Sequence, residues 1–175
     1  PSEGKSVTVA NLAVAVAQTD KEVLLIDADM RKPVQHKCFR LSNKVGLSDV
    51  ITGDKPLDKA LNRNVTGSLD VLTSGTIPPN PSELLASRQM KELLETLKER
   101  YDMILIDCAP INVVSDVAGL SQEIAGVVMV VHYGSTTYPE LDDAVNRLAL
   151  ANCNVLGFAV NEVSSKHGSG YYSNY

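Results

Sequence analysis

Pro1-Ser2-Glu3-Gly4-Lys5-Ser6-Val7 contains the final part of a phosphate-binding loop, Gly-x-x-x-x-Gly-Lys-Ser/Thr, whose opening residues would precede position 1. Gly4 lets the backbone turn close to a phosphate, Lys5 supplies a positive charge to the β- and γ-phosphates, and Ser6 offers a hydroxyl to Mg²⁺. Backbone N–H groups of the loop and of the following helix would point at the anion. Because the motif is a partial match, its interpretation depends on partners elsewhere in the chain.

The composition indicates a single globular domain. The chain has 175 residues, of which 44% are hydrophobic, enough for one well-buried core. The net charge is −5 and the basic residues are scattered, which argues against nucleic-acid binding. The longest apolar run, residues 124–131, is shorter than the roughly 20 residues of a membrane-spanning helix. The cysteines lack metal-binding spacing and indicate free thiols in a reducing cytosol.

Hydrophobic periodicity predicts alternating helices and strands along the chain. The expected helices are 6–18, 46–53, 56–61, 116–123 and 141–151, together with one continuous helix that is capped by Asn80 and has an apolar face extending to Tyr101. The expected strands are 23–27, 69–73, 103–107, 127–131 and 155–160. This order is typical of an α/β fold with a mostly parallel sheet flanked by helices on both faces. Since a phosphate-binding loop joins a strand to a helix, we expect the first strand upstream of residue 1.

Two of the predicted strands end in carboxylates. The strand 23–27 runs into Asp27-Ala28-Asp29-Met30-Arg31, and the strand 103–107 ends in Asp107. Open α/β sheets bind ligands outside the carboxyl ends of their strands. Polyphosphate needs a lysine and amide dipoles, while Mg²⁺ needs oxygen ligands. The three motifs together therefore predict an ATP–Mg²⁺ site of the P-loop NTPase type, with Walker A, A′ and B elements.

The stretch from Leu24 to Pro33 resembles the Walker A′ motif of the bacterial protein-tyrosine kinases of capsule and exopolysaccharide synthesis, and Ile104-Leu105-Ile106-Asp107 resembles their Walker B. Residues 72–85, the strand ending at Asn161 and the Tyr-rich tail are also similar, so the resemblance covers nearly the whole chain. It implies a P-loop kinase domain, residues 1–163, followed by a flexible tail, residues 164–175. It also implies autophosphorylation of Tyr171, Tyr172 and Tyr175 between neighbouring subunits of a ring-like homo-oligomer.

The resemblance further implies a cytoplasmic protein that a membrane-anchored activator recruits to the inner face of the cell membrane. A tyrosine phosphatase would be a further partner, and the process regulated would be capsular or extracellular polysaccharide synthesis. A family helix that carries Glu-x-x-Arg-x-x-Arg would lie upstream of this sequence. This chain departs from the family at Cys108-Ala109-Pro110, where Thr-Pro-Pro is usual, and in a tail with only three tyrosines.

Specific roles follow for the site residues. We expect nucleotide contacts from Asn161, which would touch adenine, and from the loop residues Ser2, Glu3, Gly4, Lys5, Ser6 and Val7. Lys5, Asp27 and Asp29 are the expected catalytic residues, and Ser6, Asp27 and Asp107 the expected metal ligands. Asp27 would accept the tyrosine proton or hold Mg²⁺. Arg31 would stabilise transition-state charge or form a salt bridge.

A competing hypothesis is a partition-type ATPase of the Min and Par group, a nucleotide-switched dimer without kinase activity. That group usually carries a second lysine early in the loop, at a position upstream of Pro1. The tail tyrosines and the Asp27-x-Asp29-x-Arg31 pattern favour the kinase. A protein that only binds a partner is disfavoured by the complete set Lys5, Ser6, Asp27 and Asp107.

Overall fold

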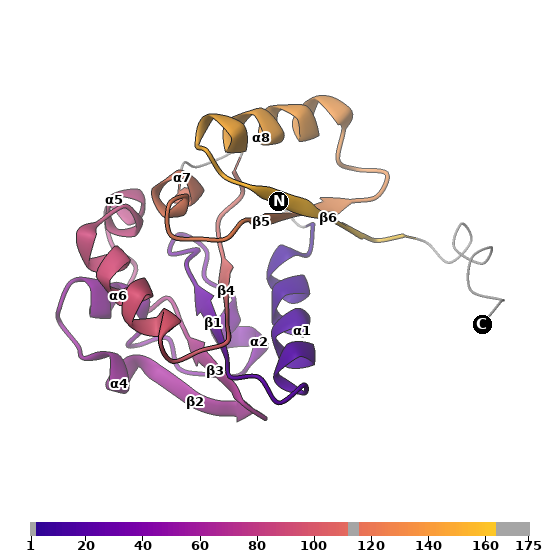
Figure 1. Ribbon diagram of the computed structural model, residues 1–175. Coiled ribbons are helices and arrows are strands. Elements are labelled where there is room, and N and C mark those ends of the chain that lie inside the picture. Colours follow the sequence, from indigo (N-terminus) through magenta and orange to yellow (C-terminus); the bar gives the residue numbers. More distant parts are fainter. Residues whose placement is uncertain (1–2, 112–115, 164–175) are drawn as a thin grey trace.

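The centre of the structure is a four-stranded sheet with the order β2-β3-β1-β4 (Figure 1). The structure is a computed structural model and describes residues 3–111 and 116–163. β1 (Val23–Asp27) runs parallel to both β3 (Leu69–Leu72) and β4 (Met103–Asp107), whereas β2 (Leu61–Thr66) pairs antiparallel with β3. Asp27 and Asp107 are register partners, so the two carboxylates predicted from the sequence emerge side by side.

Helices cover both faces of this sheet, as the apolar run of β1 predicts. Alternate residues of a strand point to opposite faces. Leu24 and Ile26 belong to a core formed with α3 (Leu47–Ile51), α4 (Leu57–Ala60), α5 (Pro81–Leu85) and α6 (Arg88–Lys98). Val23 and Leu25 belong to a second core formed with α1 (Lys5–Ala17), next to which lies the short α2 (Gln35–Cys38). All five β1 residues are buried, which explains why this strand shows no polar alternation.

The last two strands form a separate sheet. β5 (Val127–His132) and β6 (Val155–Asn161) pair in parallel, and α8 (Tyr138–Leu150) packs on one face of them next to α7 (Asp116–Leu120) (Figure 1). Leu156, Phe158 and Val160 point to the other face and are at least half exposed. A cavity of about 910 Å³ opens between β4 and β5 and reaches Lys5 and Asp107. Among the described residues the strands therefore form two sheets, both rich in parallel pairs, and the expected upstream strand stays a prediction.

Several predicted element boundaries were wrong. The expected continuous helix from Asn80 is broken into α5 and α6, because the Ser87 hydroxyl donates to Leu84 O and accepts from Met90 N, which starts a new helix. The Asn80 side chain donates to Glu83 Oε2 instead of capping the backbone. α8 starts three residues earlier than expected, since Thr137 and Glu140 form a capping box. β2 was missed, because this edge strand is polar and mostly exposed.

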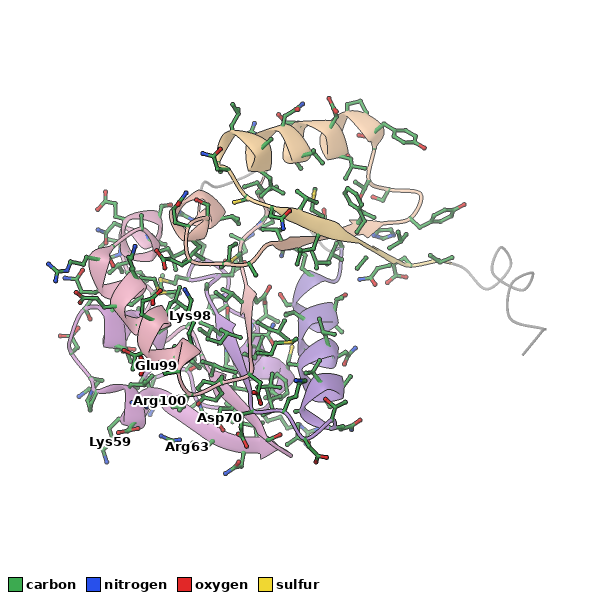
Figure 2. All side chains as sticks on the ribbon, in the orientation of Figure 1. Lys59, Arg63, Asp70, Lys98, Glu99 and Arg100 are labelled. Atoms are coloured by element: carbon green, nitrogen blue, oxygen red, sulfur yellow. The ribbon has the colours of Figure 1, made fainter. Side chains whose placement is uncertain are left out.

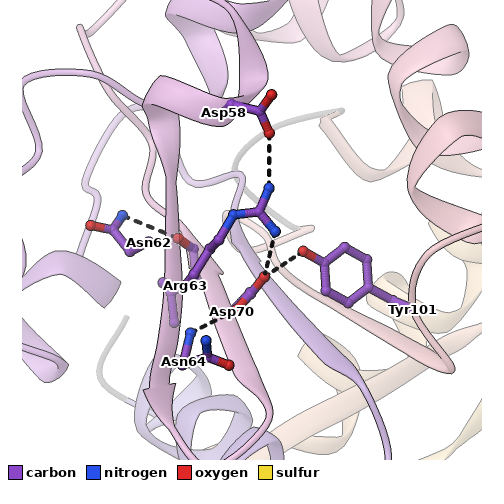
Figure 3. A network of polar contacts seen from close by, with 7 residues as sticks. Asp58, Asn62, Arg63, Asn64, Asp70 and Tyr101 are labelled. Atoms are coloured by element: carbon purple, nitrogen blue, oxygen red, sulfur yellow. Dashed lines mark hydrogen bonds and ion pairs between the residues drawn. The ribbon is translucent and has the colours of Figure 1, made fainter.

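A polar network stabilises the amino end of the main sheet, opposite the paired aspartates (Figures 2 and 3). The buried carboxylate of Asp70 accepts hydrogen bonds from the Tyr101 hydroxyl (2.6 Å) and from Asn64 N (2.7 Å). Arg63 lies 3.9 Å from Asp70 and 2.8 Å from Asp58. Burial and the bond to Asp70 raise the pKa of the Tyr101 hydroxyl, which therefore stays protonated and donates. This network joins β3 to the segment that leads into β4.

The described helices include none that is both long and apolar enough to cross a membrane. Cys38 is exposed, Cys108 is partly buried and Cys153 is buried.

Candidate nucleotide and magnesium site

The loop Glu3–Lys5 leads into the first helix at the carboxyl edge of the main sheet. Gly4 is the N-cap of α1 and has φ 79°, the left-handed region that favours glycine. A side chain at this position would also collide, because its Cβ would lie 2.7 Å from Asn161 Nδ2. Gly4 is therefore favoured by the turn and also leaves room for the Asn161 side chain.

Lys5 and Ser6 are the first two residues of α1, where backbone N–H groups lack intrahelical partners and the helix dipole favours an anion. Lys5 is partly exposed and borders the cavity between β4 and β5. Val7 follows on the outer side and is 55% exposed. This placement fits Lys5 and Ser6 to a phosphate and its metal ion. Ser2, which was expected to contact the nucleotide, lies outside the described residues.

Asp27 and Asp107 form a buried pair of carboxylates at the ends of β1 and β4. Asp27 is fully buried and Asp107 is 3% exposed. Asp27 Oδ2 accepts hydrogen bonds from Val34 N (3.0 Å) and Gln35 N (2.9 Å). Burial raises the pKa of Asp27 from 3.8 to about 7, the two backbone bonds oppose the change, and the nearby Asp107 adds to it. The pair is therefore electrostatically unfavourable until a cation joins it.

Gln35 connects this carboxylate pair to the phosphate loop and was missed in the sequence. Its side-chain nitrogen donates to Asp107 Oδ2 (2.7 Å) and to the Ser6 carbonyl (3.0 Å). The residue is fully buried at the start of α2. A glutamine two residues after Pro33 carries no motif of its own, so only the fold reveals its position.

Asp29 and Arg31 follow Asp27 in the turn after β1. Asp29 is partly exposed, and its Oδ1 accepts a hydrogen bond from Lys32 N (3.0 Å) in a turn after β1. The exposed Arg31 donates to the Ser82 hydroxyl on α5 (3.0 Å). The proposed roles of Asp29 in catalysis and of Arg31 in charge stabilisation or a salt bridge stay predictions.

Asn161 holds the phosphate loop from the end of β6. Its Nδ2 donates to the Glu3 carbonyl (2.8 Å) and to the Thr8 hydroxyl (2.9 Å). Since the amide nitrogen has two hydrogens, both are used on the loop and on α1. The predicted contact with adenine would therefore fall to Oδ1, and it stays a prediction.

The residues present fit a magnesium ion that is shared with phosphates. Mg²⁺ is usually bound by one or two carboxylates, several waters and substrate oxygens. No cluster of three or more His, Cys, Asp or Glu side chains that could hold a metal by itself occurs within 3–111 and 116–163. Asp27 Oδ1 and Gln35 Oε1 are buried and have no hydrogen-bond partner among the described residues. Buried acceptors of this kind suit the donor hydrogens of metal-bound water.

A glycine loop at a helix start, beside two carboxylates at the ends of neighbouring parallel strands, defines a P-loop nucleotide-binding protein. Residues 3–137 match the AAA domain family. The tyrosine-protein kinase YwqD of Bacillus subtilis is 45% identical over 174 residues, which cover 98% of this chain and 73% of YwqD. The tyrosine-protein kinase Etk of Escherichia coli is 36% identical over 171 residues, which cover 98% of this chain but only 24% of Etk.

Solved structures agree with these relatives. The kinase domain of Escherichia coli ETK superposes with a TM-score of 0.91 at 36% identity, covering 100% of this chain and 69% of that one. The septum site-determining protein MinD of Pyrococcus horikoshii, complexed with Mg-ADP, gives a TM-score of 0.75 at 23% identity over 94% of this chain and 68% of that one. The latter likeness concerns the fold alone. The chain belongs to the AAA domain family and, within it, to the bacterial tyrosine-protein kinases, which confirms the expected fold class and enzyme class.

Proposed function

We propose that this chain transfers the γ-phosphoryl group of ATP, with Mg²⁺, to Tyr171, Tyr172 and Tyr175 of a neighbouring subunit. The observation that carries the proposal is the buried Asp27–Asp107 pair, held beside the Gly4-Lys5-Ser6 loop by Gln35 in a chain 45% identical to a tyrosine kinase. The three tyrosines lie outside the described residues, so their part in the reaction rests on the sequence.

The charge distribution supports a separate role for each site residue. Lys5 and the amides at the start of α1 bind the β- and γ-phosphates. Ser6 and Asp107 hold the metal ion, and Asp29 acts through its waters. When bound, Mg²⁺ neutralises charge that develops on the phosphoryl oxygens. Asp27 orients the tyrosine hydroxyl and accepts its proton, a role that suits a carboxylate whose pKa is raised to about 7.

The last described strand, β6, ends close to this site. β6 ends at Asn161, which bonds to the phosphate loop, so the chain leaves the sheet at the edge that holds the carboxylates. Tyr171 follows ten residues later, a maximum reach of about 35 Å. That length allows transfer within a subunit or between subunits. The family resemblance favours transfer between neighbours in a ring-like homo-oligomer.

We infer the cellular setting from the family resemblance. The chain would act in the cytoplasm at the inner face of the membrane, where a membrane-anchored activator recruits it. A tyrosine phosphatase would reverse the modification, and the cycle would regulate capsular or extracellular polysaccharide synthesis.

A partition-type ATPase is the second candidate, because the fold also resembles MinD. A mixing experiment separates the two. A Lys5→Met chain with an intact tail is incubated with Mg-ATP and an active chain that lacks residues 171–175. Phosphotyrosine on the Lys5→Met chain is the expected result. Label that appears only when a single chain carries both the site and the tail would show transfer within one subunit, and ATP hydrolysis without phosphotyrosine would favour the ATPase.

A further inference from the structure

Gln35 contacts three residues of the candidate site: Asp27, Asp107 and Ser6. Its backbone N–H donates to Asp27 Oδ2, and its side-chain nitrogen donates to Asp107 Oδ2 and to the Ser6 carbonyl. One residue thus contacts both carboxylates and the first turn of α1. We propose that Gln35 is a positioning residue for Mg²⁺. Its Nε2 holds Asp107, and its Oε1 accepts a hydrogen bond from metal-bound water.

The orientation of the Gln35 amide follows from its neighbours. Both atoms near the nitrogen, Asp107 Oδ2 at 2.7 Å and Ser6 O at 3.0 Å, are acceptors, so the NH₂ group must face them. A flipped amide would place an oxygen against two oxygens. The carbonyl Oε1 therefore points away from this pair of acceptors.

Oε1 is the observation that separates a metal role from simple packing. It is buried and lacks a hydrogen-bond partner among the described residues, and the same holds for Asp27 Oδ1. A buried acceptor that has no hydrogen-bond partner destabilises the folded state. Asp27 and Asp107 are register partners on adjacent strands, and Gln35 binds both of them. Two acceptors beside a carboxylate pair are suited to the water shell that Mg²⁺ retains in proteins.

The contact with Ser6 links the metal site to the phosphate loop. The same NH₂ group binds Asp107 and the Ser6 carbonyl, so a movement of Asp107 would also change the hydrogen bond at the start of α1. Groups behind the direct ligands usually change metal affinity about 10- to 100-fold when they are removed. The inference rests on the proposed nucleotide–magnesium site and adds a residue that acts through the direct ligands.

The test uses binding rather than turnover. Gln35→Met has a similar length but lacks the amide. Binding of a fluorescent ADP analogue is measured in EDTA and across a MgCl₂ titration, and circular dichroism in EDTA checks that the variant is folded. For Gln35→Met, we expect the MgCl₂ concentration that gives half of the magnesium-dependent change in ADP binding to rise about 10- to 100-fold. The ADP affinity measured in EDTA should change less than about threefold. Gln89→Met, at an exposed position of α6, is the matched control and should behave as the original chain does.

A folded Gln35→Met chain with an unchanged magnesium dependence would overturn the inference, as would an equal loss of ADP affinity with and without Mg²⁺. If the variant fails to fold, the original chain decides the question by NMR. The Gln35 side-chain amide signals should shift when Mg²⁺ is added to the ADP complex, and signals that stay in place would refute the proposal. A chain that binds no ADP would instead contradict the proposed function.

Discussion

Replacing Asp27 by asparagine should stabilise the metal-free protein although it removes a central site residue. Asp27 Oδ2 accepts both backbone bonds, from Val34 N and Gln35 N, and an asparagine oxygen can take its place. Oδ1 has no hydrogen-bond partner among the described residues, so an NH₂ group there breaks none of the bonds described. The substitution therefore keeps the hydrogen bonds and removes a buried charge.

The magnitude follows from the pKa of Asp27, which burial and Asp107 raise from 3.8 to about 7. At about 1.36 kcal/mol for each tenfold change in proton affinity, ionisation of this group destabilises the folded state by at most about 4 kcal/mol. The folded protein binds the proton more tightly than the unfolded chain. The contribution of protonated Asp27 to the free energy of unfolding is therefore complete below pH 3.8, falls as the pH rises, and is lost above about pH 7.

The assay is urea unfolding in EDTA at several pH values. The free energy of unfolding of Asp27→Asn should match that of the original chain near pH 4 and exceed it by about 2–4 kcal/mol at pH 8. Asp29→Asn, at a partly exposed position, is the control and should differ by less than about 1 kcal/mol. An Asp27→Asn chain that is less stable than the original at pH 8 would refute the reasoning.

Three further predictions concern other contacts. Asn161→Ala removes the hydrogen bonds to Glu3 O and to the Thr8 hydroxyl, so it should weaken ADP binding, measured by calorimetry, about tenfold. The control Asn146→Ala, at an exposed position, should leave the affinity unchanged. Equal affinities for the two variants would show that the loop does not need this support. Asp49→Ala removes an acceptor of bonds from Gly46 N, Thr76 N and the Thr76 hydroxyl and should lower the free energy of unfolding by about 3 kcal/mol at pH 7. Burial raises the pKa of Asp49, but these bonds outweigh it and lower the pKa, so the difference should shrink as acid protonates Asp49; a difference that grows in acid would contradict this. Phosphorylation of three tyrosines would add about −4.5 to −6 charges to a chain whose net charge is −5. Light scattering should therefore show that an oligomer dissociates on phosphorylation, and added salt should partly restore it by screening the charges. An oligomer size that stays unchanged at every salt concentration would reject the idea.

The main sheet was largely predictable because β1, β3 and β4 are short apolar runs that end in polar residues. β1 and β3 are buried along their whole length, the pattern expected of strands covered on both faces, whereas β4 is only partly buried. β2 could not be predicted, since Asn62, Arg63 and Asn64 make an exposed edge strand held by pairing with β3 and not by hydrophobic burial. The break at Ser87 was also hidden, because the apolar spacing continues across it while the serine hydroxyl starts a new helix.

The candidate site was predictable where a motif fixes the chemistry. Lys5, Asp27 and Asp107 stand at positions that the loop and the strand ends define. Gln35 was missed because its role depends on the fold that brings α2 back to β4, a contact between residues far apart in sequence. The bonds from Asn161 to the loop likewise depend on where β6 ends relative to α1.

The most direct test of the kinase assignment is intact mass spectrometry of the chain after incubation with Mg-ATP, followed by mapping of the modified residues. We expect mass increments of one, two and three phosphoryl groups, located on Tyr171, Tyr172 and Tyr175. The increments should be absent with EDTA and in the Lys5→Met chain, which should unfold in urea as the original chain does, because Lys5 is partly exposed. A folded chain that binds ADP and hydrolyses ATP but gains no phosphotyrosine would contradict the account.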